Sequence, residues 1–166
     1  MQIIYMHHAN RDMSKGKSQE NPITKEGFNE AKAIGELLGI ANFSAKCIYT
    51  GEFLRYQQTN EQINKYLQVT VIIDKRLNEF DKKTKEETGR EYEKRIHQLL
   101  DEIIKNHNND DIIICMTSGI ALTCFMSYFI KGKPIKGFQV MYGTTVSPVS
   151  FIYNKEGKGQ YLTEWN

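Results

Sequence analysis

Five polar side chains of this sequence offer the groups that phosphoryl transfer uses, and each follows a short apolar stretch. They are His7, His8, Arg55, Glu79 and Ser118. In that chemistry a nucleophile attacks phosphorus, cationic donors hold the equatorial oxygens, and an acid protonates the leaving group. An imidazole, a guanidinium, a carboxyl and a hydroxyl supply these parts. The sequence therefore predicts a phosphoryl-transfer site if the fold brings the five residues to one place.

The apolar stretches before these residues are typical of short buried strands. Residues 3–6 and 112–116 are continuously apolar, and residues 47–49 and 69–73 are short and strand-like. Uninterrupted hydrophobicity suits a strand of a parallel sheet that helices cover on both faces. The carboxyl ends of parallel strands meet at one edge of the sheet, where open α/β sheets bind ligands. We expect the polar residues to converge at that edge.

Helical periodicity alternates with the strand-like stretches. Thr24 is expected to cap a helix whose apolar residues repeat at helical spacing from Phe28 to Leu38. Residues 92–104 repeat in the same way, and another apolar helix is expected after Gly119. This alternation predicts an α/β fold, a three-layer sandwich with a mostly parallel sheet and helices on both faces.

The C-terminal part of the chain predicts a closing hairpin. Residues 145–153 and 161–165 are strand-like, and residues 154–159 between them have turn composition. The sequence has no internal repeat and no linker, and its length of 166 residues is close to that of one typical domain. We expect a single domain over residues 1–166.

Bulk composition argues against several classes of partner. The net charge is only +2, which gives no reason to expect a nucleic acid or an anionic membrane as partner. The Lys- and Glu-rich residues 81–90 are expected to form a solvated loop or a helix start. No stretch approaches the roughly 18 apolar residues of a membrane span, and residues 1–5 do not resemble a secretion signal.

The three cysteines indicate a reducing environment. Cys47, Cys115 and Cys124 are an odd number without Cys-x-x-Cys spacing, which argues against a disulfide framework or a zinc knuckle. We therefore expect a cytoplasmic location. Cys115 is expected to be a buried core residue rather than a nucleophile, because Ala121 stands where a cysteine phosphatase loop needs an arginine.

Other interpretations of the histidines stay open. The pair His7 and His8 could be structural or bind a metal. Adjacent residues of an extended strand point to opposite faces, and no third ligand has a helpful spacing, so we expect no metal here. His97 and His107 fall in a helical stretch and a polar turn, and they are expected to face solvent.

Several segments, in their order along the chain, resemble the histidine phosphatase superfamily, the phosphoglycerate-mutase-like proteins. Residues 3–9 fill the place of the family's strand ending in Arg-His-Gly. Residues 22–31 are similar to its Pro-Leu-Thr-x-x-Gly helix start, and residues 49–59 to its strand-Ser-Pro-x-x-Arg-Ala-x-Gln-Thr segment. Residues 77–79 resemble its Leu-x-Glu segment, and residues 111–119 its strand ending in Ser-His-Gly. The resemblance spans almost the whole chain.

The resemblance implies a role for each of the five site residues. His8 falls on the nucleophilic histidine, Arg55 on the phosphate-binding arginine and Glu79 on the acidic proton donor. His7 and Ser118 stand where the family has an arginine and a second histidine, and they would line the phosphate pocket. Arginine offers a permanently charged fork, whereas histidine is only partly protonated near neutral pH and serine carries no charge. Losing one preorganised donor typically lowers the rate about 10²–10³-fold.

The resemblance therefore implies a phosphatase-like protein that hydrolyses a phosphomonoester through a phosphohistidine, with weak activity. The alternative is a catalytically inactive relative that binds a phosphorylated or anionic ligand, or a protein partner. A mutase fits less well, because its long-lived phosphohistidine needs the groups that are missing. A small phosphorylated molecule or phosphate is the expected ligand, and no cofactor is expected. The sequence names neither a substrate nor an oligomeric state.

Overall fold

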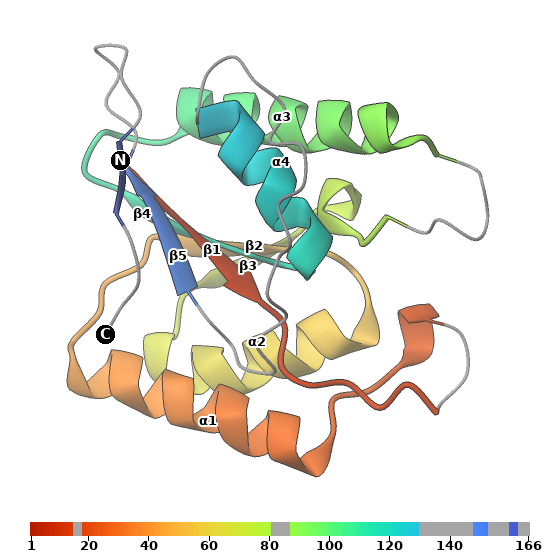
Figure 1. Cartoon of the computed structure of the whole chain (residues 1–166). Helices are drawn as coiled ribbons and strands as arrows, with labels where there is room; N and C mark the ends of the chain where they lie inside the picture. Colours follow the sequence, from red (N-terminus) through yellow and green to blue (C-terminus); the bar gives the residue numbers. More distant parts are fainter. Residues whose placement is uncertain (15–17, 81–86, 130–147, 153–159, 163–166) are drawn as a thin grey trace.

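The computed structural model describes residues 1–14, 18–80, 87–129, 148–152 and 160–162. These residues form one six-stranded sheet between two layers of helices (Figure 1). The α-helices are α1 (Lys25–Ile40), α2 (Leu54–Leu67), α3 (Gly89–Asn106) and α4 (Gly119–Phe129), and two short 3₁₀ helices are η1 (Ser18–Glu20) and η2 (Lys75–Leu77). The strands are β1 (Gln2–His7), β2 (Cys47–Thr50), β3 (Thr70–Ile73), β4 (Ile112–Thr117), β5 (Pro148–Ile152) and β6 (Gln160–Leu162).

The sheet is mostly parallel, with an antiparallel edge. Its strand order is β3-β2-β4-β1-β5-β6, and the first four strands of this order run parallel. β5 pairs antiparallel with β1, and β6 pairs antiparallel with β5. Helices α1 and α2 cover one face, and α3 and α4 cover the other (Figure 1). This arrangement confirms the predicted α/β sandwich, including the antiparallel strand pair near the C-terminus; the turn predicted at 154–159 lies outside the described residues.

Strand β1 is buried on both faces, which explains its uninterrupted apolar sequence. Ile3 and Tyr5 pack into the core under α3 and α4, whereas Ile4 and Met6 pack into the core under α1 and α2. Side chains of a strand alternate between its faces, so a strand in the middle layer must be apolar at every position. Burial of one such side chain stabilises the fold by about 1.5–3 kcal/mol.

Two helices begin at side-chain caps that the sequence supplies. The Oγ1 of Thr24 accepts a hydrogen bond from the Gly27 N–H at 3.0 Å, as predicted for the start of α1. Helix α3 begins with a capping box in which Thr88 and Glu91 exchange side-chain and backbone hydrogen bonds. The Lys- and Glu-rich stretch therefore ends in a helix start; residues 81–86 of it lie outside the described part.

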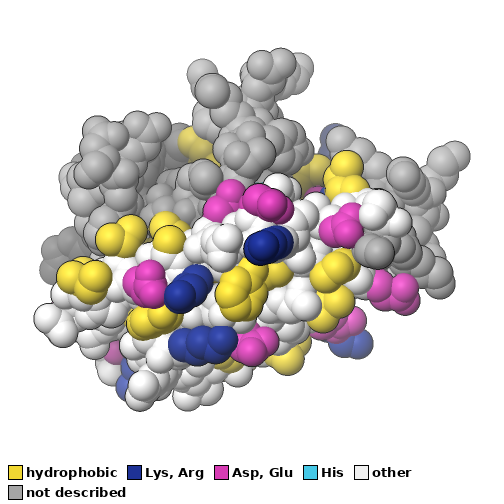
Figure 2. Space-filling model, turned by 90° about the horizontal axis from the view of Figure 1, so that it is seen from below, with side chains coloured by type: hydrophobic (Ala, Val, Ile, Leu, Met, Phe, Trp, Pro, Cys, Tyr) yellow, Lys and Arg dark blue, Asp and Glu magenta, His cyan; other side chains and the backbone are white. Residues whose placement is uncertain are grey.

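The outer face of α1 and α2 has a mixed surface. Figure 2 views the molecule from below and shows hydrophobic side chains interspersed with basic and acidic ones. Phe28, Leu37 and Ile40 of α1 are among the exposed apolar residues. Scattered apolar side chains of this kind are ordinary on a protein surface. Among the helices of the described residues, none combines the length and hydrophobicity that a membrane span requires.

The structure confirms one prediction about single residues and corrects another. Cys115 is fully buried in the core, and burial raises the pKa of its thiol, so it is not a reactive nucleophile. His97 and His107, predicted to face solvent, are instead partly buried. His107 Nε2 lies 3.1 Å from the Tyr49 hydroxyl, and His97 Nε2 lies 3.0 Å from the Cys124 carbonyl oxygen. Neither partner is close in sequence, so local composition gave no sign of these contacts.

Candidate active site

Register at the carboxyl ends of β1 and β4 places His8 beside Ser118. His7 is the register partner of Thr117, so the residues that follow leave the sheet side by side. The His8 N–H donates to the Thr117 carbonyl at 3.1 Å, which extends the strand pairing by one bond. Thr117 is itself anchored, because its hydroxyl donates to the Leu77 carbonyl oxygen at 2.6 Å.

The His8 ring is held with one defined nitrogen available for chemistry. Its Nδ1 lies 2.7 Å from the Ala9 carbonyl oxygen. A carbonyl oxygen only accepts, so Nδ1 carries the proton and Nε2 of the neutral ring keeps its lone pair. The side chain is 6% exposed, and this burial, with His7 next to it, holds the pKa of His8 well below its usual range. His8 is therefore a neutral imidazole with a free Nε2 at neutral pH.

The His7 ring lies against the His8 ring, tilted by 35° from it, instead of pointing away. The two ring centroids lie 4.2 Å apart, and His7 Nδ1 lies 2.6 Å from the His8 carbonyl oxygen. The prediction that the two side chains point to opposite faces is wrong, because β1 ends at His7 and His8 has already left the strand. Burial lowers the pKa of His7, and the nearby Glu79 only partly opposes this effect.

Arg55 is a fully buried cation at the start of α2. Its Nη1 donates to the Ser18 carbonyl at 2.6 Å and its Nη2 to Glu79 Oε2 at 2.8 Å. Its Nε has no hydrogen-bond partner among the described residues. The guanidinium also lies over the Phe53 ring, 4.8 Å from its centroid. A guanidinium stays protonated in proteins, so burial keeps a full positive charge under the surface here.

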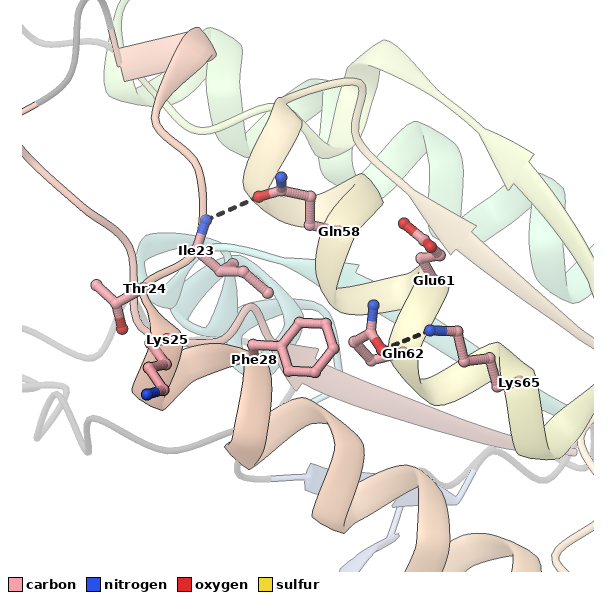
Figure 3. Close-up of a pocket in the computed structure, with 8 residues that line it drawn as sticks. All are labelled: Ile23, Thr24, Lys25, Phe28, Gln58, Glu61, Gln62 and Lys65. Carbon is pink, nitrogen blue, oxygen red and sulfur yellow. Dashed lines mark hydrogen bonds between the residues drawn. The ribbon is translucent and has the colours of Figure 1, made fainter.

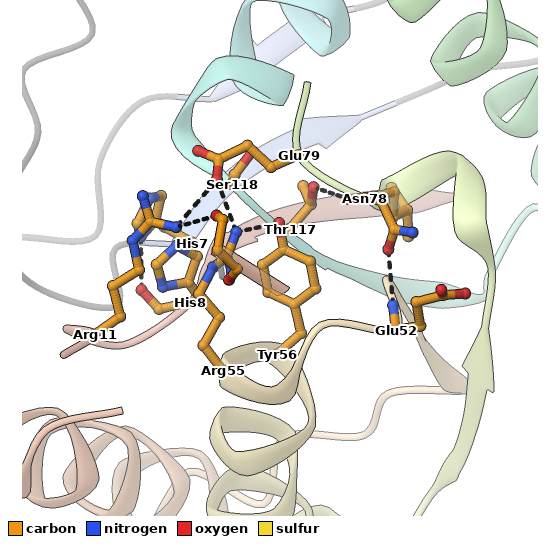
Figure 4. Close-up of polar contacts among 12 residues, drawn as sticks. His7, His8, Arg11, Glu52, Arg55, Tyr56, Asn78, Glu79, Thr117 and Ser118 are labelled. Atoms are coloured by element: carbon orange, nitrogen blue, oxygen red, sulfur yellow. Dashed lines mark hydrogen bonds and ion pairs between the residues drawn. The ribbon is translucent and has the colours of Figure 1, made fainter. Parts of the chain in front are cut away.

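The Tyr56 ring lies against both His8 and Arg55. Its centroid is 5.5 Å from that of the His8 ring and 4.6 Å from the Arg55 Cζ. Burial raises the pKa of Tyr56 to about 12, so its phenol stays neutral. The imidazole and the guanidinium thus belong to one cluster, as the predicted site requires (Figure 4).

Glu79 reaches the same cluster from the segment after η2. Its Oε2 accepts from Arg55 and also from Arg11 Nη1, at 3.2 Å. The preceding residue Asn78 is fixed on both sides, because its side chain accepts from the Glu52 N–H at 2.9 Å and its carbonyl accepts from Arg95 at 3.0 Å. This anchoring aims the Glu79 carboxylate at the arginines.

Ser118 belongs to the same cluster (Figure 4). The residue is fully buried, and its carbonyl accepts from the Tyr5 hydroxyl at 2.9 Å. Its own hydroxyl lies near the hydroxyl of Tyr56, yet it makes no hydrogen bond of ordinary geometry within the described part of the chain. Ser118 therefore adds a neutral, fully buried hydroxyl to the cluster, next to the phenols of Tyr56 and Tyr92.

All five predicted site residues lie in this cluster, together with three that sequence reasoning missed. Those three are Arg11, Tyr56 and Thr59, which accepts from the Ala9 N–H at 3.1 Å. Arg11 could have been predicted from the sequence, because it stands in the same polar stretch as His8. Thr59 is the last residue of the 49–59 segment that resembles the family, but the sequence analysis gave it no role in the site. Tyr56 had only its position on the helix of Arg55. The described residues include no group of three or more His, Cys, Asp or Glu side chains that could hold a metal ion.

A surface pocket between α1 and α2 is separate from this cluster. It has a volume of about 420 Å³ and lies beside Phe28, Gln58 and Lys65 (Figure 3). Gln58 Oε1 accepts from the Ile23 N–H at 2.8 Å at its edge. None of its lining residues belongs to the His8 cluster, and its walls carry no unpaired buried group.

The sequence and the fold define the class of protein. The chain matches the profile of the histidine phosphatase superfamily (branch 1) over residues 4–86 and 80–166. It therefore belongs to that superfamily, in agreement with the fold. No curated protein sequence matches the chain.

Solved structures of the same fold cover almost all of the chain. The protein histidine phosphatase SixA, complexed with tungstate, is 14% identical with a TM-score of 0.75, over 98% of this chain and 95% of that one. Bacillus stearothermophilus YhfR is 18% identical with a TM-score of 0.76, over 98% and 96%. A mutant phosphoserine phosphatase from Entamoeba histolytica, in complex with phosphoserine, is 15% identical with a TM-score of 0.75, over 98% and 95%.

Proposed function

We propose that this protein is a phosphatase that hydrolyses a small phosphomonoester through a phosphohistidine at His8. The observation that carries the proposal is the state of the His8 ring, whose Nδ1 is bound to the Ala9 carbonyl while Nε2 keeps its lone pair. Nucleophilic attack needs this neutral form. Family membership supports the reaction class, and the tungstate and phosphoserine bound by two neighbours support a small phosphorylated ligand.

The reaction divides into two steps. In the first, His8 Nε2 bonds to phosphorus while the bond from phosphorus to the ester oxygen breaks. Glu79, which is paired with Arg55 as a carboxylate in the empty site, takes a proton from solvent before this step and gives it to the departing alcohol. In the second, Glu79 takes a proton from water, whose oxygen attacks phosphorus as the bond to Nε2 breaks. Arg55 holds phosphoryl oxygens throughout, with hydrogen bonds from His7 and Ser118. Inorganic phosphate is released and His8 regains its neutral state.

Activity is expected to be weak, because two positions of the pocket carry no fixed charge. His7 has a lowered pKa in the empty site and Ser118 is neutral. Each missing cationic donor costs about 10²–10³ in rate where it acts alone. Residues of one site rarely act independently, so the combined loss is smaller than the product.

The test is release of phosphate from an aryl phosphate by the purified protein. Replacement of His8 by alanine is expected to abolish the activity, whereas the matched variant His97→Gln keeps it. His97 lies on α3 and contacts the Cys124 carbonyl, outside the cluster. Equal rates for the wild type and His8→Ala would refute the phosphohistidine route.

A second candidate function is binding without turnover. It is favoured by Glu79, because a carboxylate that is paired with Arg55 at 2.8 Å holds no proton for a leaving group. A protein of this kind would bind a phosphorylated ligand and release no phosphate. Calorimetry with inorganic phosphate, combined with the aryl phosphate assay, separates the two candidates.

A further inference from the structure

Two arginines from distant parts of the chain meet on one carboxylate oxygen. Arg11 Nη1 and Arg55 Nη2 lie 3.2 Å and 2.8 Å from the same atom, Glu79 Oε2 (Figure 4). Arg11 belongs to the segment that follows β1, and Arg55 to the first turn of α2. Donation from two guanidinium groups to a single oxygen is the arrangement that binds an oxyanion.

The two guanidinium groups also share a second residue, Ser18. Arg11 Nη1 donates to its hydroxyl at 3.0 Å, and Arg55 Nη1 donates to its carbonyl at 2.6 Å. One residue of η1 therefore positions both groups, which would otherwise repel each other. Their proximity is stable only when an anion lies between them.

Arg11 is held in place by its backbone as well. It forms an antiparallel bridge with Ile23, and the next residue, Asp12, donates its N–H to the Pro22 carbonyl at 2.8 Å. The Arg11 side chain is only 23% exposed. An arginine fixed in this way loses little conformational freedom when it binds a ligand.

The net charge of these side chains favours the binding of a dianion. Two guanidinium groups carry two positive charges, and the Glu79 carboxylate cancels one of them. His7 and His8 are neutral at neutral pH, so they add no further charge. A bound dianion in place of Glu79 would cancel both positive charges.

We propose that Arg11 is a second phosphate-binding arginine, and that Glu79 is an internal anion which fills the Arg11–Arg55 clamp until a phosphate dianion displaces it. This inference rests on the proposed function, because it assigns the phosphate site of that reaction. Arg11, which lies in the segment after β1, supplies the positive charge that His7 lacks. The displaced carboxylate lies next to a dianion, and like-charge repulsion then favours its taking a proton from solvent. Glu79 thereby becomes the acid that the first step needs.

Calorimetry with tungstate, a stable tetrahedral dianion, tests the clamp. Arg11→Gln is expected to weaken tungstate binding on the order of 10- to 100-fold, the cost of one charge-assisted hydrogen bond. The tungstate affinity of Arg11→Lys, which keeps the charge, is expected to fall between those of the wild type and Arg11→Gln. The matched control is Arg90→Gln, since Arg90 is exposed on α3. Melting curves of all variants verify folding.

Two further comparisons test the role of Glu79 and of charge. Glu79→Gln removes the competing anion and is expected to tighten tungstate binding about 10-fold while lowering turnover, because the acid is lost. Perrhenate, a monoanion of similar shape, is expected to bind the wild type more weakly than tungstate. Unchanged tungstate affinity in Glu79→Gln, or equal affinity for the two anions, overturns the displacement.

The outcomes separate this inference from the function on which it rests. A wild type that binds tungstate and releases phosphate, with Arg11→Gln binding equally well, overturns the clamp and leaves the phosphatase intact. A wild type that neither binds tungstate nor hydrolyses an aryl phosphate overturns both. Weaker binding in Arg11→Gln, with Arg90→Gln unchanged, supports the clamp.

Discussion

Thr59 accepts a hydrogen bond from the backbone N–H of Ala9 at 3.1 Å, and its hydroxyl donates to the Arg55 carbonyl at 2.7 Å. One buried hydroxyl thus joins the residue after His8 to the helix that carries the buried arginine. The Ala9 carbonyl in turn fixes the His8 ring. His8 and Arg55 are therefore positioned by a single connection between two segments about fifty residues apart.

Replacement of Thr59 by valine is expected to impair the site more than the fold. Valine has a similar shape but leaves the buried Ala9 N–H without an acceptor, which costs about 1–3 kcal/mol of unfolding free energy. The free Ala9 segment then holds His8 less well, so kcat falls by more than KM changes. Thr59→Ser keeps the hydroxyl and should keep both properties. Denaturant unfolding and aryl phosphate kinetics of the two variants check this, and equal kinetics for valine and serine would count against the connection.

Restoring an arginine at position 7 should depend on Arg11. If Arg11 already supplies the second positive charge, His7→Arg adds little to kcat/KM of the wild type. In an Arg11→Gln background the same change should recover roughly 10-fold or more of the lost activity, because the charge is then missing. A double-mutant cycle in kcat/KM measures this coupling. Equal gains in both backgrounds would show that the two positions act independently.

Stability should fall as the pH is lowered from about 7.5 to about 5.5. Both His7 and His8 have lowered pKa values in the folded protein, while in the unfolded chain they titrate near the ordinary value of about 6.5. The unfolded chain therefore binds more protons below that pH. The contribution of each histidine to the free energy of unfolding is fully present above the pKa of the unfolded chain. It is lost as the pH falls from that value toward the lower pKa of the folded protein, by up to about 1.4 kcal/mol per pH unit for each group.

Urea unfolding at several pH values, in a buffer without phosphate, measures this slope. His8→Gln removes one titrating group and should make the dependence shallower. A wild type that is equally stable at both ends of the range, or a variant with an unchanged slope, is incompatible with two buried neutral histidines.

Gly27 should tolerate no side chain, because α1 passes close to the segment after His8. A Cβ at Gly27 would lie 2.9 Å from the Asn10 backbone nitrogen. Gly27→Ala must displace Asn10 and is expected to lose about 1–3 kcal/mol of stability. Gly89, at the start of α3, has nothing within 4 Å of the same position, so Gly89→Ala should be neutral or slightly stabilising. Thermal unfolding of Gly27→Ala and Gly89→Ala measures the difference. Similar melting temperatures for the two variants would refute the close approach of α1 to Asn10.

Much of the fold follows from patterns that are local in sequence. The buried strand at Ile3 and Ile4 and the cap at Thr24 were predictable, because a middle-layer strand must be apolar throughout and a helix start needs a side-chain acceptor. The convergence of the site residues followed from the rule that parallel strands end at one edge. Strand-end residues such as His8 and Ser118 were therefore found from the sequence.

The contacts that sequence reasoning missed depend on side-chain direction. The contact between the His7 and His8 rings arises because the strand ends between these residues. A strand boundary is uncertain by a residue or two in any sequence pattern. Arg11 reaches Glu79 only because η1 and the Ile23 bridge turn its segment back toward α2. Contacts between side chains so far apart in sequence leave no periodic pattern from which they could be predicted. Two of the proposals, the clamp and the internal anion, thus needed the structure.

The measurement that tests the account most directly is detection of a phosphoryl group on His8 during turnover. The wild type, mixed with an aryl phosphate and stopped by rapid alkaline quench, is expected to carry an acid-labile phosphoryl group that peptide mass spectrometry assigns to His8. His8→Ala should show neither the modification nor turnover. Steady release of phosphate by a protein whose His8 is never phosphorylated, or by His8→Ala, would contradict the mechanism.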